Sequence, residues 1–459
     1  MSAWTKIFSW FGKNNLKPPK IEAYSPTIYN TWNKQQLIDR ILLLEKKNAT
    51  NGIKALPSIL FNDNNNNNNN NLISLKEKEK EKRKFDMSKY PQHRVAFKVA
   101  YLGWNYLGFA AQKETDQTVE AELFKALEKC KLINHPDECG FTRCGRTDKG
   151  VSGVGQVISL NVRQHQQKDT HNHHHQQPFP YIETLNSLLP KDIRVHAWAK
   201  VSPDFNARFD CISRTYKYMF VKNNDLDLEK MKQAAGYLIG THDFRNFCKV
   251  DPSKQLNYER TILSLDIQPV FATTATKNNN TQCYEITLKG TAFLWHQVRC
   301  IMSILFLVGQ RLESPDIIKH LLDIDTVIAK PDYPLASDLP LLLYDCEFKG
   351  INWQYGKRPY RLEQHWNDLW YDQCVRTWLY DTFLNGLEQQ KQQHNNNNND
   401  QISRKKAIAV ILGGGRHIRT TKYRPLLTRP RADSEQVKRA KYEAKLQRKK
   451  KENSSSLTQ

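Results

Sequence analysis

Residues 143–151 read Arg-Cys-Gly-Arg-Thr-Asp-Lys-Gly-Val and lie between a predicted helix and a predicted strand. Gly145 and Gly150 permit tight backbone turns on either side of Asp148. Arg146 and Asp148 are two residues apart, so in extended backbone their side chains share a face. A guanidinium there keeps the carboxylate ionised, and an ionised carboxylate can act as nucleophile or base. The residues alone leave a second interpretation open, a structural Arg–Asp pair in a turn.

Outward from this stretch, the first half of the chain alternates strands and helices. Residues 95–101 place apolar side chains at every second position, which predicts a half-buried strand. Thr118 is a predicted N-cap for a helix whose buried side includes Val119, Leu123 and Leu127. Further strands are predicted at 158–162, 193–201 and 214–222, and a further helix at 181–189.

A second set of elements follows. It comprises a helix at 228–239, strands at 261–267 and 284–290, a long apolar helix at 294–310 and a strand at 341–348. This order of strands and helices is an α+β pattern. Two such sets, 85–225 and 226–350, predict two domains of similar size with a cleft between them.

The two ends of the chain have a different composition. Residues 1–84 form an N-terminal extension, with a short amphipathic helix at 35–47 and a linker rich in Asn, Lys and Glu at 48–84. The linker has too little apolar surface to offset the entropy of ordering, so it is predicted to be disordered. Residues 351–459 form an extension that is first aromatic and then basic. We expect its aromatic side chains to pack a helix, with stacking on RNA as the alternative.

Composition narrows the class of protein. The 459 residues include 69 Lys and Arg against 47 Asp and Glu, a net charge of +22 that favours a polyanionic partner. Nine cysteines without Cys-x-x-Cys spacing argue against a structural zinc site and against a disulfide framework. The histidines of the Gln-rich insertion at 164–178 are interpreted as low complexity rather than as a metal site. No apolar run reaches the roughly 18 residues of a membrane span.

Several motifs together resemble one family. Gly145-Arg146-Thr147-Asp148-x-Gly150-Val151 resembles the active-site motif of the TruA-type tRNA pseudouridine synthases. Further segments resemble that family in the same order, at 101–109, 205–209, 213–218 and 293–299. Within the family, the chain is most similar to the eukaryotic branch that modifies positions 38 and 39 of the tRNA anticodon stem-loop. It departs from the family at Gly153, often Ala, and at Asn206, often His in bacterial relatives.

The resemblance implies an isomerase that converts uridine to pseudouridine in tRNA. No redox or group transfer is involved, so no cofactor and no metal is expected. Asp148 would be the essential carboxylate, Arg146 would pair with it and help hold the extruded nucleotide, and Tyr216 would lie against the target base. A core role for Tyr216 remains open, because Tyr218 shares its alternation. Phosphate contacts near the cleft are expected from Lys149, Arg208 and Arg299, with solvent-facing charges as the alternative.

The pattern and the resemblance together imply an α+β fold. Two similar mixed α/β domains with antiparallel sheets would flank a central basic active-site cleft, with disordered low-complexity segments added. The expected partners are tRNA and, because bacterial relatives are dimers, a second copy of the chain; no membrane is expected. The expected compartment is the nucleus or the cytoplasm, with mitochondrial targeting as the alternative because residues 1–20 lack acids.

Two other functions and a role for His296 are the alternatives that the sequence leaves open. A non-catalytic RNA-binding or chaperone protein on the same scaffold is disfavoured by the intact Arg146, Asp148 and Tyr216. An Asp-dependent hydrolase with acidic metal ligands is disfavoured because no carboxylate cluster lies beside Asp148 in the sequence. His296 lies within the predicted apolar helix, where a hydrogen-bonded core histidine is the ordinary interpretation and a role in the cleft the alternative.

Overall fold

The computed structural model describes most of the chain beyond the N-terminal extension. The described residues are 87–164, 179–222, 226–253, 257–270, 282–395 and 407–455. The predictions for 1–84 and for most of the insertion at 164–178 concern residues outside these ranges. The chain divides into two units, Met1–Arg83 and Lys84–Gln459, and every element below belongs to the second.

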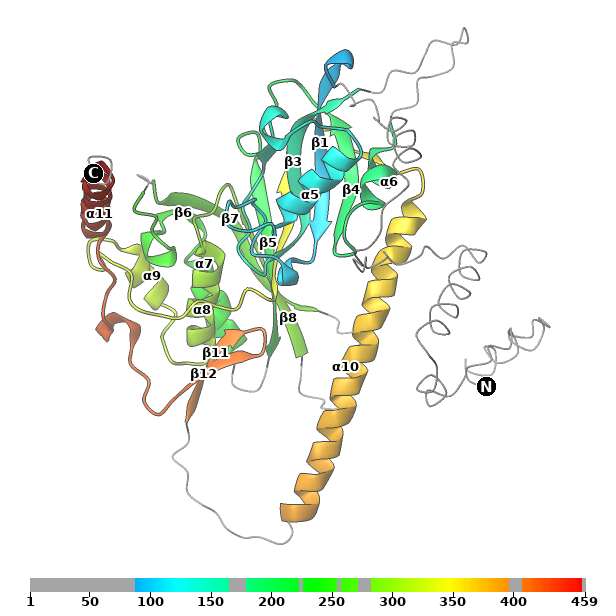
Figure 1. Cartoon of the computed structure of the whole chain (residues 1–459). Helices are drawn as coiled ribbons and strands as arrows, with labels where there is room; N and C mark the ends of the chain where they lie inside the picture. Colours follow the sequence, from blue (N-terminus) through cyan, green and yellow to red (C-terminus); the bar gives the residue numbers. More distant parts are fainter. Residues whose placement is uncertain are drawn as a thin grey trace, which may run out of the picture. The chain divides into compact units, whose positions relative to one another are not determined.

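A ten-stranded, mostly antiparallel sheet is the framework of this unit (Figure 1). Its order is β10-β4-β1-β3-β9-β5-β8-β7-β6, with β2 paired to β3. The strands are β1 Gln92–Tyr101, β2 Thr142–Arg143, β3 Ser152–Arg163, β4 Ile193–Lys200, β5 Ser213–Lys222, β6 Gly240–Asp243, β7 Glu259–Val270, β8 Gln282–Gly290, β9 Leu341–Glu347 and β10 Gln354–Tyr355. Strand β9 is parallel to β3 and antiparallel to β5, so it joins strands from the first and second halves of the chain.

The first half of the sheet is covered by α5 (Val119–Lys129) and α6 (Tyr181–Asn186) (Figure 1). The side chain of Thr118 accepts a hydrogen bond from the amide of Ala121, which confirms the predicted N-cap. Leu123 and Leu127 of α5 are buried against β1, β3 and β4. Burial of each such leucine contributes about 1.5–3 kcal/mol.

The second half carries its own core. Helices α7 (Leu228–Gly236), α8 (Gln297–Gly309) and α9 (Ile317–Leu322) pack beside β5, β7 and β8 (Figure 1). Every residue of α8 except Arg299 is buried. A helix that is apolar all round belongs in a core, so α8 can serve as a rigid base for the segment that precedes it.

A third, smaller cluster lies on the other face of the central strands. Ala96 and Val157 alternate with the core residues Val95 and Ile158, so they point to the opposite side of the sheet. They pack there with Leu343 and with three cysteines. This cluster therefore lies on that opposite face at the strands β3, β9 and β5, where the two halves of the chain meet.

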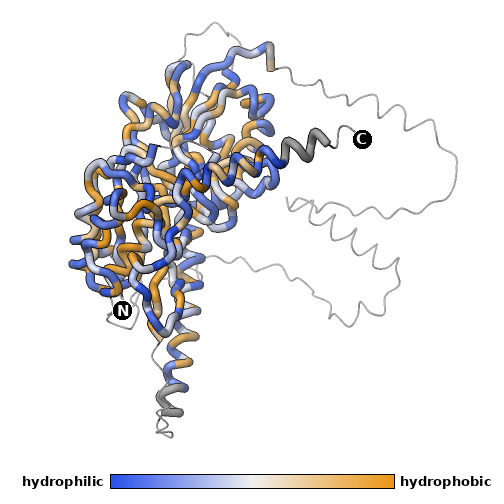
Figure 2. Tube along the Cα trace, turned by 90° about the vertical axis from the view of Figure 1, so that its left-hand side faces the viewer, coloured by the Kyte–Doolittle hydropathy of each residue, from blue (hydrophilic) through white to orange (hydrophobic). Residues whose placement is uncertain are grey.

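The C-terminal extension contains α10 (Pro359–Asn395), the hairpin β11 (Ile408–Gly413) and β12 (Arg416–Thr420), and α11 (Glu435–Ser455). Hydrophobic residues occur along α10 among hydrophilic ones (Figure 2). The expected packing of its aromatic side chains holds at the start of the helix, where Trp366 donates to His196 at 3.1 Å. It does not hold further on, since Trp378 and Phe383 are both 63% exposed. The aromatic side chains thus lie along the helix, and its hydrogen bonds with β4 come from His365 and Trp366 near its start.

The α+β expectation is confirmed at the level of a mixed fold with a large, mostly antiparallel sheet. Within the described ranges, the predicted strands and helices occur, with ends displaced by a few residues. Several elements were not predicted, among them β2, β6, β10, α9, the two strands of the β11–β12 hairpin and α11. Among the described helices, none combines the length and the apolar character that a membrane span requires.

Candidate active site

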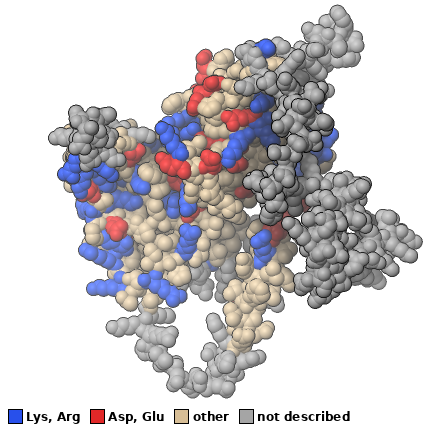
Figure 3. Space-filling model, viewed as in Figure 1, with Lys and Arg blue, Asp and Glu red and all other residues tan. Residues whose placement is uncertain are grey.

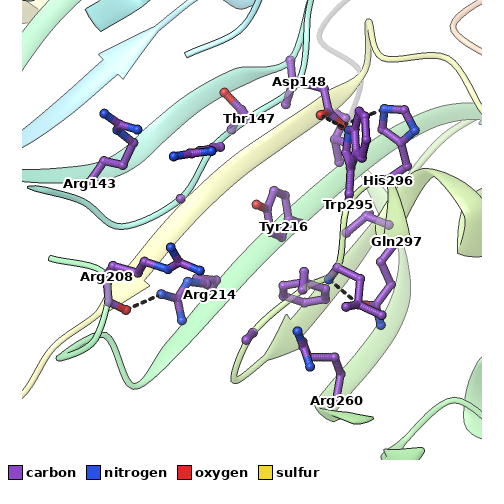
Figure 4. A pocket seen from close by; sticks show the side chains of 18 of the residues that line it. Arg143, Thr147, Asp148, Arg208, Arg214, Tyr216, Arg260, Trp295, His296 and Gln297 are labelled. Carbon is purple, nitrogen blue, oxygen red and sulfur yellow. Dashed lines mark hydrogen bonds and ion pairs between the residues drawn. The ribbon is translucent and has the colours of Figure 1, made fainter. Parts of the chain in front are cut away.

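A cavity of about 730 Å³ lies where the two halves of the sheet meet (Figure 4). This volume falls within the roughly 300–1,000 Å³ typical of ligand sites. Residues from both halves line it, including Arg143, Gly145 to Asp148, Asn206, Arg208, Arg214, Tyr216, Arg260 and Phe293 to Arg299. A second cavity of about 550 Å³ shares Arg146, Asp148, His296 and Arg299 with the first.

The loop that carries Asp148 is anchored by hydrogen bonds along its length. The buried amide of Gln156 accepts from Gly145 N at 3.2 Å and donates to Gly145 O at 2.8 Å. The hydroxyls of Tyr101 and Thr147 are hydrogen-bonded at 2.8 Å. Gly150 ends the loop at φ +79°, a conformation that favours glycine. The sequence around Asp148 therefore folds into a short, fixed support for the carboxylate.

The carboxylate of Asp148 points toward the segment that precedes α8. Trp295 Nε1 donates to Oδ1 at 3.1 Å, and His296 Nε2 lies 3.5 Å from Oδ2 (Figure 4). Burial raises the pKa of Asp148, while Arg299, the hydrogen bond from Trp295 and Lys249 act in the opposite direction. The partial desolvation of this carboxylate is the kind of perturbation that catalytic acids and bases show.

The structure differs from the expected pairing of Arg146 with Asp148. Both residues border the same two cavities, yet no ion pair joins them in the described part of the chain. The two oxygens of the carboxylate instead contact Trp295 and His296. The positive charges that act on Asp148 come from Arg299 and Lys249, and the exposed Arg146 guanidinium stays available beside the cavity.

Tyr216 lies on the wall of the larger cavity (Figure 4). It is only partly buried, whereas Tyr218, two residues further along β5, is in the core and donates to Ser337 O at 3.0 Å. Phe293 packs edge-on against Tyr216, with 5.1 Å between the ring centroids. Burial raises the pKa of Tyr216 well above its ordinary value, so its hydroxyl keeps its proton.

The three expected phosphate contacts have different environments. Lys149 is exposed beside the second cavity, and Arg208 is exposed at the first. The guanidinium of Arg299 already has partners within the chain. Its Nε donates to Ala336 O at 2.8 Å, and its Nη2 lies 3.7 Å from Asp338 Oδ1. Arg299 is therefore placed to act on Asp148, and the other two are free to meet a ligand.

Of the two side chains that contact Asp148, Trp295 was not predicted as a site residue, and for His296 a role in the cleft was only the alternative interpretation. His296 is not inside an apolar helix but is the N-cap residue of α8, in the left-handed conformation at φ +64°. Burial, with Arg299, Lys249 and Lys330, lowers the pKa of His296 to about 4, so the imidazole is neutral at neutral pH. Trp295 is 45% exposed, with the Lys249 ammonium 4.1 Å from its ring centroid. The sequence signal for both residues was their place in segment 293–299, one of the segments that resemble the family.

Comparison with known proteins gives consistent matches. The family described as tRNA pseudouridine synthase matches residues 234–349. The tRNA pseudouridine(38/39) synthase of Saccharomyces cerevisiae is 44% identical over 344 residues, covering 73% of this chain and 75% of that protein. The Homo sapiens protein of that name is 42% identical over 67% of this chain and 66% of its own length. A solved Cbf5-Nop10-Gar1 complex aligns at 13% identity with a TM-score of 0.22, covering 48% of this chain and 45% of that chain, too weak a likeness to support an argument.

An archaeal relative extends the similarity beyond eukaryotes. The tRNA pseudouridine synthase A of Methanosphaerula palustris is 35% identical over 55% of this chain and 80% of its own length. On the strength of these identities and coverages, the chain belongs to the tRNA pseudouridine synthase family.

Proposed function

We propose that this protein isomerises uridine to pseudouridine in the anticodon stem-loop of tRNA, at position 38, position 39 or both. The names of its relatives in yeast and human support this substrate. The observation that carries the proposal is the Asp148 carboxylate, held by Trp295 on the wall of a cavity of about 730 Å³. A carboxylate in such a cavity can reach a nucleotide that has left its stem.

The reaction needs a positioned carboxylate and no co-substrate. The C–N glycosidic bond between the sugar and N1 of uracil breaks, the base turns, and C5 bonds to the sugar in its place. C5 then loses its proton and N1 gains one, so the product is an isomer of the substrate. Asp148 starts this sequence either by adding to the sugar or base or by removing a ribose proton. The target uridine must first flip out of the stack, which costs a few kcal/mol.

The other residues of the cavity take complementary roles in this proposal. Arg146 holds the flipped nucleotide, since its guanidinium is exposed at both cavities. Tyr216 lies against the target base as a protonated phenol, a form that its raised pKa supports. Such a phenol can donate a hydrogen bond, but it is a poor acceptor for the proton that leaves the base. Arg299 keeps Asp148 ionised rather than contacting phosphate.

Phosphate contacts are assigned to the exposed Lys149 and Arg208, which flank Asp148 from two loops. On the face shown in Figure 3, Lys and Arg also predominate over Asp and Glu around α11 and the β11–β12 hairpin. Contacts of this kind give sequence-independent affinity that falls as salt rises. We assign them the role of holding the tRNA while Asp148 acts on one nucleotide.

We further propose that residues 85–225 and 226–350 are two domains with the basic active-site cleft between them. One hydrophobic core lies wholly within residues 85–225 and a second lies mostly within 226–350, with Tyr218 and Phe220 of β5 also packed in the second, and this supports the division. The cavity draws its lining from both halves, with Asp148 from the first and Trp295 from the second. We also propose that two copies of the chain associate, and that the protein acts in the nucleus or the cytoplasm.

The test replaces Asp148 by Asn, which keeps the shape and removes the charge. Purified Asp148→Asn is expected to bind tRNA with unchanged affinity and to form no pseudouridine in a single-turnover assay. Asp266→Asn, an exposed aspartate of β7 outside the cavity, is the matched control and should be fully active. Unchanged product with Asp148→Asn would refute the site. No product from the unmodified enzyme would favour a non-catalytic RNA-binding protein, and chelator-sensitive hydrolysis of the RNA in place of pseudouridine formation would favour a metal-dependent hydrolase.

A further inference from the structure

Three cysteines meet beneath the strands that carry the active site. The sulfurs of Cys144, Cys211 and Cys346 lie within 4.8 Å of one another. Cys144 follows β2, Cys211 precedes β5 and Cys346 lies in β9, so three segments far apart in the sequence converge here. The three residues are 3%, 8% and 5% exposed. Their side chains therefore face one another and are buried apart from a slight exposure at Cys211.

The spacing of the sulfurs suits a single thiophilic ion. Zinc binds thiolates at about 2.3 Å, so sulfurs at the corners of a tetrahedron around it lie about 3.8 Å apart. The sulfurs here need to approach by at most about 1 Å, a shift that side-chain rotation supplies. No fourth His, Cys, Asp or Glu joins the group among the described residues. Three protein ligands with a solvent molecule in the fourth position form a recognised zinc arrangement.

The positive charge of Arg214 beside the cysteines favours Zn²⁺ over Cu⁺. Arg214 is buried and interacts electrostatically with all three sulfurs. Its guanidinium is held in place, because Nη2 donates to Cys144 O at 3.2 Å and to Arg208 O at 2.8 Å. Three thiolates with Zn²⁺ carry one net negative charge, which the guanidinium cancels. With Cu⁺ one negative charge would remain uncompensated, and a buried unpaired charge is costly.

We propose that Cys144, Cys211 and Cys346 bind one Zn²⁺ ion beneath the active site, with a solvent molecule as the fourth ligand. The ion ties the segment before Asp148 to the start of β5 and to β9. Cys144 immediately precedes Gly145, so the ion holds the base of the loop whose other supports are Gln156 and Tyr101. The site supplies rigidity and takes no part in the isomerisation.

Metal content tests this directly. The full-length protein, purified under a non-thiol reductant and supplied with Zn²⁺, is expected to retain one zinc per chain after desalting. Cys144→Ser and Cys346→Ser should each retain less than a tenth of that amount. Cys139→Ser is the matched control, because Cys139 is also buried but donates to Pro136 O, outside the group. Asp148→Asn should bind zinc normally, which separates this proposal from the proposed function.

A measurement on the unsubstituted protein covers the case in which a cysteine variant fails to fold. X-ray absorption at the zinc edge is expected to show three sulfur neighbours at about 2.3 Å. Replacement of zinc by Co²⁺ should add a sulfur-to-metal charge-transfer band. Zinc retained below a tenth of an equivalent, a first shell of nitrogen and oxygen alone, or full zinc content in both cysteine variants would each overturn the proposal.

Discussion

At the scale of single residues, the pH dependence of the reaction depends on the charge of Asp148. Burial raises its pKa, so the carboxylate loses its charge at a higher pH than an ordinary aspartate does. Activity should therefore fall on the acid side at that higher pH. Arg299 opposes the rise, so Arg299→Gln should raise the pKa further and move the acid limb of the single-turnover rate to still higher pH.

Arg311→Gln is the control for this prediction. Arg311 is an exposed cation that pairs with Asp227, away from both cavities. Its loss should leave the pH profile where it is. An acid limb that stays in place or moves to lower pH in Arg299→Gln would show that Arg299 does not act on the charge of Asp148.

The backbone of His296 gives a second prediction. At φ +64° a side chain is strained, and glycine avoids that cost. His296→Gly should therefore be more stable to urea than His296→Ala by about 1 kcal/mol, although both variants lose the imidazole beside Asp148. Both should be about equally slow in pseudouridine formation. At the exposed position Lys232 in α7 the order should reverse, because glycine destabilises a helix. The same order at both positions would contradict the argument.

The candidate site shows which of its residues can be predicted from local sequence patterns. Asp148, Arg146 and Tyr216 came from local motifs, and all three line one cavity. Trp295 and His296 stand 147 and 148 positions beyond Asp148, and only the pairing of β5, β8 and β9 brings them to it. Cysteine spacing likewise indicates only metal sites whose ligands are close in the sequence. It gave no sign of Cys144, Cys211 and Cys346, which the fold brings together from distant segments.

At the scale of elements, the loop from Gly145 to Gly150 depends on one side chain of β3. Gln156 is fully buried and makes two hydrogen bonds with the backbone of Gly145. Gln156→Leu leaves both backbone groups without partners, which should cost about 1–3 kcal/mol each at most in urea unfolding. Gln268→Leu, at an exposed position of β7, should change stability by less than about 0.5 kcal/mol. Equal effects of the two substitutions would show that Gln156 does not anchor the loop.

Elements with strong periodicity were predictable, and short or tertiary ones were not. The cap at Thr118 and the apolar stripe of α5 can be recognised in the sequence alone. Strand β10 has two residues and exists only because β4 offers its edge. The hairpin of β11 and β12 crosses a glycine-rich turn in which Gly413, Gly414 and Gly415 all have positive φ. The glycine run marks a turn in the sequence, but the strands on either side of it are short and were not predicted.

At the scale of the whole molecule, α10 carries a run of exposed aromatic side chains among the residues that the structure describes. Trp370, Trp378 and Phe383 are 57%, 63% and 63% exposed. Residues 359–390 contain five acidic side chains and two arginines, a charge balance that repels phosphate. Stacking on RNA is thereby disfavoured, and an apolar protein surface is the better partner. The proposed association of two copies would bury this helix against its counterpart.

That association gives the last prediction. Each aromatic side chain that becomes buried in the interface contributes about 1.5–3 kcal/mol, so a few of them hold a dimer at micromolar concentration. The unsubstituted protein should sediment as a dimer, and the double variant Trp378→Glu/Phe383→Glu as a monomer, because buried carboxylates cannot be ionised without a partner. Gln373→Glu, on an exposed polar position of the same helix, should stay dimeric. If the double variant sediments as a dimer, the two copies meet elsewhere; if the unsubstituted protein is a monomer, α10 meets another partner.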